Sequence, residues 1–155
     1  MLIAFKGPVI QGIFEEVPDV PRDFKTYTDY TKLSKQYPQW TKVQTIAYTD
    51  ENGLRKVDNY YCVAMGSYYT NTVGDLFRIT TETGNVFEVI ITDFKADRDT
   101  DIKNQYTTLN YCMVEFYVDV AGLPSKARRC GTISKIDGFD GKVISIERLG
   151  NYFEV

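Results

Sequence analysis

The sequence predicts one mainly β domain that closes into a small barrel, preceded by an irregular N-terminal arm over residues 1–40. From Trp40 onward the chain is a series of short apolar or alternating runs separated by Gly and Asn, which is typical of a β-sandwich or a barrel. Twelve Tyr and nine Phe favour pleated, half-buried surfaces. A chain of 155 residues has room for one such core, so we assign residues 41–155 to the barrel.

The N-terminal arm is marked by proline. Four of the five Pro fall in the first forty residues, and Pro lacks the N–H that a central strand needs. Within the arm, Phe24, Tyr27 and Tyr30 follow one another at three-residue spacing, which allows one short helix between residues 23 and 36. Such an arm packs either on its own barrel or on a protein partner, and the sequence leaves both open.

Six strands are predicted after the arm. Residues 50–53 (DENG) and 82–85 (ETGN) suit hairpin turns. Residues 95–110 are long and polar, and we expect an exposed loop that crosses one end of the barrel. Residues 121–129 predict a second crossing, with at most one helical turn after Pro124. The strands are expected at residues 42–48, 59–64, 76–80, 86–92, 111–120 and 142–148.

Composition excludes several classes of function. The net charge is −3 and no basic stripe is present, so nucleic acid is not an expected partner. The chain has no His, so acid–base chemistry falls to carboxylates, Lys or Tyr. The three Cys lack metal-ligand spacing, so we expect no metal and no cofactor, and we expect buried free thiols at Cys62 and Cys112. No apolar run reaches the ~18 residues of a membrane span, and residues 1–10 lack a signal-peptide pattern, so a soluble protein without a membrane partner is expected.

Four segments occur in an order that is typical of one superfamily. They are an apolar strand that ends in small residues (61–72, YCVAMGSYYTNT), a second strand (74–79, GDLFRI), a β-branched strand that ends in Asp93 and continues into a Lys-containing loop (84–101, GNVFEVIITDFKADRDTD), and a closing strand (113–120, MVEFYVDV). This order resembles the double-psi β-barrel superfamily, which includes the rare lipoprotein A-like proteins, the three-aspartate domains and the C-terminal part of membrane-bound lytic transglycosylase A. The resemblance implies a closed six-stranded double-psi-type barrel.

The resemblance also implies a function directed at peptidoglycan. In three-aspartate members the signature is Asp-Thr-Gly, then Lys-Gly, then an Asp at the start of an aromatic strand. Asp93 matches the first Asp and Glu115 falls near the second, whereas Phe94 replaces the Thr-Gly. Lytic transglycosylases use one Asp for both proton steps, which implies this role for Asp93. Asp101 and Glu115 are then candidate helpers, and Lys95 either orients the substrate or holds Asp93 ionised. Residues 93–101 are similar to versions in phage and Gram-positive bacterial proteins, which implies an extracellular, cell-wall-associated or virion-associated location.

The strand pattern gives Asp93 a chemical rationale. In a regular strand, residues 87, 89 and 91 form an apolar stripe that Asp93 ends. Desolvation there favours a carboxyl group that keeps its proton near neutral pH, as a general acid in glycoside cleavage must. Flat aromatic faces for a sugar are available at Tyr61, Tyr68 and Tyr69.

The same residues have structural interpretations that stay open. Asp93 could cap the following loop by accepting backbone N–H groups, Glu115 could point outward, and the tyrosines could fill the core. Alternating Asp at 97, 99 and 101 suits calcium, but no Gly stands within the run and no Glu closes it. The sequence therefore supports two functions: a peptidoglycan-directed, lytic transglycosylase-like enzyme, and a non-catalytic cell-wall-binding or phage tail or surface assembly module.

Overall fold

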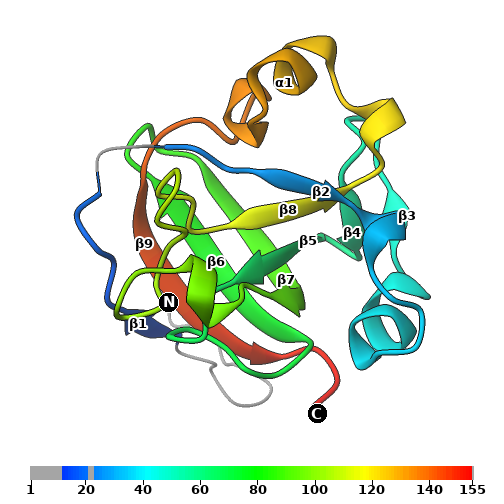
Figure 1. Ribbon diagram of the computed structural model, residues 1–155, viewed down its shortest axis with the longest axis horizontal. Helices are drawn as coiled ribbons and strands as arrows, with labels where there is room; N and C mark the ends of the chain where they lie inside the picture. The colour runs from blue at the N-terminus through cyan, green and yellow to red at the C-terminus, as the bar shows by residue number, and fades with distance from the viewer. Residues whose placement is uncertain (1–11, 21–22, 155) are drawn as a thin grey trace, which may run out of the picture.

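The computed structural model describes residues 12–20 and 23–154, and in these residues the protein is mainly β, as predicted (Figure 1). This part of the chain contains two short helices, the π-helix η2 (Gln39–Gln44) and the α-helix α1 (Ser125–Cys130). It also contains the single 3₁₀ turns η1 (Tyr30–Lys32), η3 (Asp97–Asp99), η4 (Val120–Gly122) and η5 (Ile133–Lys135). The strands are β1 (Ile13–Glu15), β2 (Tyr27–Asp29), β3 (Tyr48–Thr49), β4 (Arg55–Val57), β5 (Tyr60–Met65), β6 (Asp75–Thr81), β7 (Val86–Phe94), β8 (Glu115–Val118) and β9 (Val143–Asn151).

The nine described strands form one mixed sheet. Their order is β1-β9-β6-β7-β5-β4-β3, and β8 pairs with β5 and with β2. β5 runs parallel to β7, and β2 runs parallel to β8, whereas the other pairs are antiparallel. Among the described residues this path ends at β1 and at β3 without returning on itself. The closed six-stranded barrel is therefore not confirmed.

The arm supplies two of the strands that the sequence does not predict. β1 adds to β9 and β2 adds to β8, so that segments far apart in the chain lie side by side (Figure 1). Each of these strands has only three residues, and Pro18 lies in the connection between them rather than in a ladder. In the region where a short helix was expected, the arm forms β2 and the 3₁₀ turn η1 instead.

Local patterns predict the central strands well. The strands expected at residues 59–64, 76–80, 86–92 and 142–148 are confirmed as β5, β6, β7 and β9, with ends shifted by a few residues. After Pro124, where at most one helical turn was expected, the chain forms the longer six-residue helix α1. The strand expected at 111–120 is shorter, because Tyr111 has a positive φ of 61° and pairing starts only at Glu115.

The strand expected at residues 42–48 is wrong for most of its length. Residues 39–44 form the π-helix η2, in which the N–H of Thr45 donates to the carbonyl of Trp40. Val43 and its neighbour Gln44 are both buried. Successive residues of a strand point to opposite faces, so a strand could not bury this pair against one surface.

The sheet buries both of its faces. Residues 87, 89 and 91 of β7 belong to the larger core cluster. Ile90 belongs to a smaller cluster on the other face, to which η2 contributes Val43. Strands covered on both sides have nearly continuous apolar sequences, as β7 does. Tyr117 of β8 is also a member of the smaller cluster, and it borders the site described next.

Candidate functional site

A cleft of about 560 Å³ lies where β7 and β8 meet the long loop that follows β7. Three predicted site residues line it, namely Asp93, Lys95 and Glu115, and Tyr117 and Arg98 line it as well. The cleft therefore combines carboxylates with basic side chains and a phenol. Its volume lies within the range of about 300–1,000 Å³ that is typical of small-ligand sites.

Asp93 reaches the cleft through a break in the alternation of β7. Val63 of β5 pairs with Ile91. The next residue, Ala64, pairs with Asp93, so Thr92 is an extra residue in β7, a β-bulge. The prediction that Asp93 shares the face of the apolar stripe is therefore wrong, because a shift of one residue moves the following side chains to the other face.

The same pairing puts Glu115 in one row with Asp93. Ala64 pairs with Asp93 on one side and with Glu115 on the other. Directly paired residues point to the same face, and two strand spacings, about 10 Å, separate the two backbones. Both acidic residues are half-buried. Two carboxylates of different strands thus belong to one cleft.

Each carboxylate is held by one hydroxyl group. Tyr117 Oη donates to Oδ2 of Asp93 over 2.6 Å, and Thr28 Oγ1 donates to Oε2 of Glu115 over 2.6 Å. In the described part of the chain, the other oxygen of each carboxylate accepts no hydrogen bond, and no backbone N–H donates to the Asp93 side chain. The interpretation of Asp93 as a loop cap is therefore not supported, and one oxygen of each group is available to a ligand.

Tyr117 is the site residue to which the sequence analysis assigns no role. Burial raises the pKa of its phenol, and the negative charge and accepted hydrogen bond of Asp93 raise it further, so Tyr117 remains a donor throughout the physiological pH range. The sequence could have indicated that Tyr117 belongs to the site, because it lies two residues after Glu115 on one strand and such residues share a face. The sequence could not indicate that Thr28 contacts Glu115, because the strand that carries Thr28, β2, was not predicted.

Lys95 is buried at the cleft and is held by two hydrogen bonds. Its backbone N–H donates to the carbonyl of Met65, which continues the pairing of β7 with β5. Its ammonium group donates to Thr107 Oγ1 over 2.8 Å. No carboxylate of the described residues lies within 4.0 Å of this ammonium group. Lys95 therefore lines the cleft without a direct ion pair to Asp93.

Asp101 does not line the cleft and instead organises the long loop. Its Oδ1 accepts the N–H groups of Gln105 and Tyr106 over 2.6 and 2.9 Å, and its Oδ2 accepts that of Lys103 over 3.1 Å. Partial burial acts to raise the pKa of Asp101, but the backbone hydrogen bonds outweigh it and lower the pKa. The contacts of Asp101 are those of a loop cap.

The three predicted sugar-platform tyrosines also lie outside the cleft wall. Tyr61 packs edge-on against Phe139, with ring centroids 5.0 Å apart, inside an aromatic cluster. Tyr68 is exposed and packs edge-on against Tyr69. Tyr69 is buried, and its hydroxyl donates to the carbonyl of Glu16. Of the three residues, Tyr68 is the most exposed.

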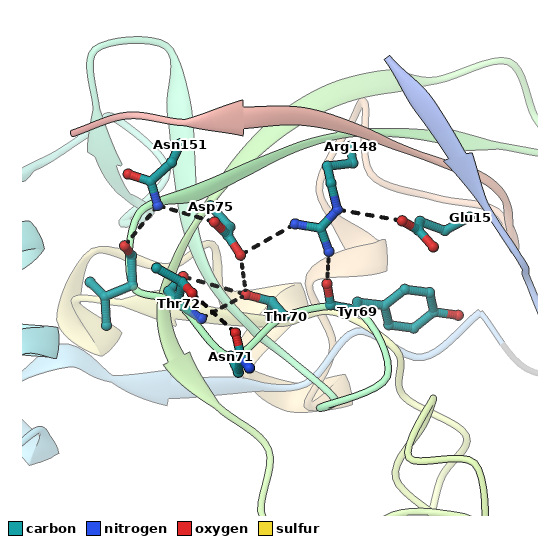
Figure 2. Close-up of polar contacts among 9 residues, drawn as sticks. Glu15, Tyr69, Thr70, Asn71, Thr72, Asp75, Arg148 and Asn151 are labelled. Carbon is teal, nitrogen blue, oxygen red and sulfur yellow. Dashed lines mark hydrogen bonds and ion pairs between the residues drawn. The ribbon is translucent and has the colours of Figure 1, made fainter. Parts of the chain in front are cut away.

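A polar network fixes the loop that carries Tyr69 (Figure 2). Asp75 accepts hydrogen bonds from Thr70 Oγ1 at 2.7 Å and Asn151 Nδ2 at 3.0 Å, and it pairs with Arg148 at 3.3 Å. Arg148 also donates to the carbonyl of Tyr69. These contacts tie the loop between β5 and β6 to β9, so this part of the chain has a structural role.

The Asp97 to Asp101 run does not form a cation cage. Asp97 and Asp99 are exposed, and Asp97 accepts a hydrogen bond from Ser67 over 2.6 Å. Across residues 12–20 and 23–154, no three His, Cys, Asp or Glu side chains are grouped to hold a metal ion. The helices of the same residues are all too short or too polar to cross a membrane.

Comparisons with known proteins identify no relative. No protein-family model, curated protein or solved structure matches this chain.

Proposed function

We propose that this protein is a peptidoglycan-directed, lytic transglycosylase-like domain in which Asp93 is the general acid and base. The observation that carries the proposal is the half-buried Asp93 carboxylate, which lines a cleft of about 560 Å³ with Glu115 in the same row and has one oxygen that accepts no hydrogen bond from the described residues. The double-psi relationship belongs to the same proposal. It is supported by the four segments that carry the resemblance, which include β5, β6, β7 and β8 in the expected order.

The proposed reaction uses no water. Asp93, protonated at Oδ1, donates its proton to the glycosidic oxygen as the bond from that oxygen to the anomeric carbon breaks. The resulting Asp93 carboxylate then takes the proton from a hydroxyl group of the same sugar, whose oxygen bonds to the anomeric carbon. An anhydro sugar and a free sugar hydroxyl are formed. The Glu115 carboxylate stabilises positive charge at the anomeric carbon.

The proposal is tested by incubating the purified protein with peptidoglycan and analysing soluble products by mass spectrometry. Anhydro-muropeptides are expected from the wild type, and Asp93→Asn lowers their rate of release by at least about a hundredfold. Asp58→Asn is the matched control, because Asp58 accepts a hydrogen bond from Tyr152 over the same 2.6 Å outside the cleft. Absence of products from folded wild-type protein, or equal release by Asp93→Asn, contradicts the proposal.

A non-catalytic assembly module is the second candidate, and β1 favours it. β1 ends the path of the described strands, and its residues Ile13 and Phe14 are 64% and 71% exposed. Exposed apolar side chains on an unpaired strand edge suit pairing with another chain. Sedimentation of the wild type with cell walls, without product release, and loss of self-association in Ile13→Lys would favour this function over the enzyme.

A further inference from the structure

Tyr117 reaches Asp93 across an intervening strand. Tyr117 belongs to β8 and Asp93 to β7, with β5 between them. The ring can cross because Ala64, the β5 residue between the two carboxylates, has only a methyl side chain. Ala64 is 1% exposed and Tyr117 is 5% exposed, so both are covered in the folded protein. The phenol is therefore held in one place by packing as well as by its hydrogen bond.

Among residues 12–20 and 23–154, the hydroxyl group of Tyr117 has one hydrogen-bond partner, and that partner is Asp93. A buried tyrosine hydroxyl is costly unless it is hydrogen-bonded, whereas Phe would fill the same space without that cost. The hydrogen bond to Oδ2 is short, at 2.6 Å, as expected for a hydroxyl group that donates to a carboxylate. Since Oδ2 accepts from the phenol, the proton of a protonated Asp93 belongs on Oδ1.

We infer that Tyr117 is a positioning residue for Asp93: it holds Oδ2 and orients Oδ1 for both proton transfers with the glycan. The inference rests on the proposed function. Tyr117 exchanges no proton with the substrate in this role and acts only through the carboxylate. Thr28 holds Glu115 in the same manner, with one oxygen bound and one available.

The test compares Tyr117→Phe with Tyr152→Phe. Both substitutions remove one hydrogen bond of 2.6 Å between a tyrosine and an aspartate, but only Tyr117 lines the cleft. In peptidoglycan cleavage, Tyr117→Phe is expected to lower kcat by about tenfold to a hundredfold, because the hydrogen bond to the negative charge that develops on Asp93 during proton transfer is lost, and to leave KM within about twofold. Tyr152→Phe is expected to change neither constant. A kcat for Tyr117→Phe within twofold of the wild type overturns the inference and leaves the proposed function intact.

A second measurement separates the inference from the proposed function. The side-chain carboxyl carbon of Asp93 is observed by NMR in ¹³C-labelled protein, without substrate. Its resonance is expected to move in Tyr117→Phe and to stay in Tyr152→Phe, while the Asp58 resonance shows the reverse. If the wild type cleaves no glycan, the proposed function fails on its own, whereas an unmoved Asp93 resonance in Tyr117→Phe overturns the inference.

Discussion

Replacement of Asp101 by Ala tests whether this residue caps the long loop or assists catalysis. The substitution removes one acceptor group that binds three backbone N–H groups. Loss of a side-chain cap costs about 0.5–2 kcal/mol. A hydrogen bond to a charged group contributes about 1.5–3 kcal/mol. Because Asp101 is partly exposed, water competes for the same groups and reduces the net contribution of each hydrogen bond. We therefore expect Asp101→Ala to lower the free energy of unfolding by about 2 kcal/mol in total.

Urea denaturation followed by circular dichroism measures this loss. With an m-value of about 2 kcal/mol per molar urea, the midpoint falls by about 1 M. Asp99→Ala is the control, since Asp99 lies in the same loop and is exposed, and we expect a change within about 0.5 kcal/mol. Equal midpoints for the two variants would refute the capping role. A wild-type midpoint in Asp101→Ala, together with lost cleavage, would instead favour the catalytic helper.

The effect of Asp101 depends on pH in a defined direction. Backbone hydrogen bonds hold the pKa of Asp101 in the folded protein below its ordinary value of 3.8. A carboxyl group of this kind contributes its full stabilisation above the unfolded-state pKa and loses it as the pH falls through the folded-state pKa. The difference between the wild type and Asp101→Ala is therefore constant above about pH 5 and shrinks below about pH 4. A difference that grows on acidification contradicts the assignment.

Two further predictions concern the thiols and the polar network. Cys62 and Cys112 are buried, and burial raises the pKa of Cys62 to about 12, whereas Cys130 is exposed. We therefore expect iodoacetamide at pH 8 to alkylate one thiol in the native protein and all three in urea, as measured by mass spectrometry. Arg148→Met leaves the buried Asp75 with only two of its three partners, and we expect the free energy of unfolding, measured by urea denaturation, to fall by about 1–3 kcal/mol. An unchanged midpoint would show that the network does not stabilise the fold.

The elements that sequence predicts correctly depend on nearby residues. β6 and β7 are joined by residues 82–85, in which Gly84 has the positive φ that such a turn requires, and both strands are rich in β-branched and aromatic residues. β1 and β2 depend on pairing with strands more than eighty residues away. Nothing in a three-residue segment such as Tyr27–Asp29 specifies its partner, so these strands and the open path of the sheet follow from tertiary packing.

The sequence predicts most of the proposed site residues that line the cleft, but not how the structure positions them. Asp93, Lys95 and Glu115 do line one cleft, because the end of β7, the loop after it and the start of β8 meet there. Asp101 was grouped with them by its nearness in sequence. Its neighbours Lys103 and Gln105 show why that grouping fails, since the loop turns back on the Asp101 carboxylate away from the cleft.

The bulge in β7 and the unpredicted π-helix are two parts of one contact. Gln44 of η2 donates from Nε2 to Thr92 Oγ1 over 3.0 Å, and Thr92 donates to the carbonyl of Gln39 over 3.2 Å. Thr92 is the extra residue of β7, so its polar side chain is satisfied only because η2 packs against this face. Without the bulge, strict alternation would direct Asp93 toward the larger apolar core, where a carboxylate without a partner is strongly disfavoured. The placement of Asp93 in the cleft therefore depends on the bulge, whose extra residue is hydrogen-bonded to a helix about fifty residues earlier, and no periodicity within β7 can indicate it.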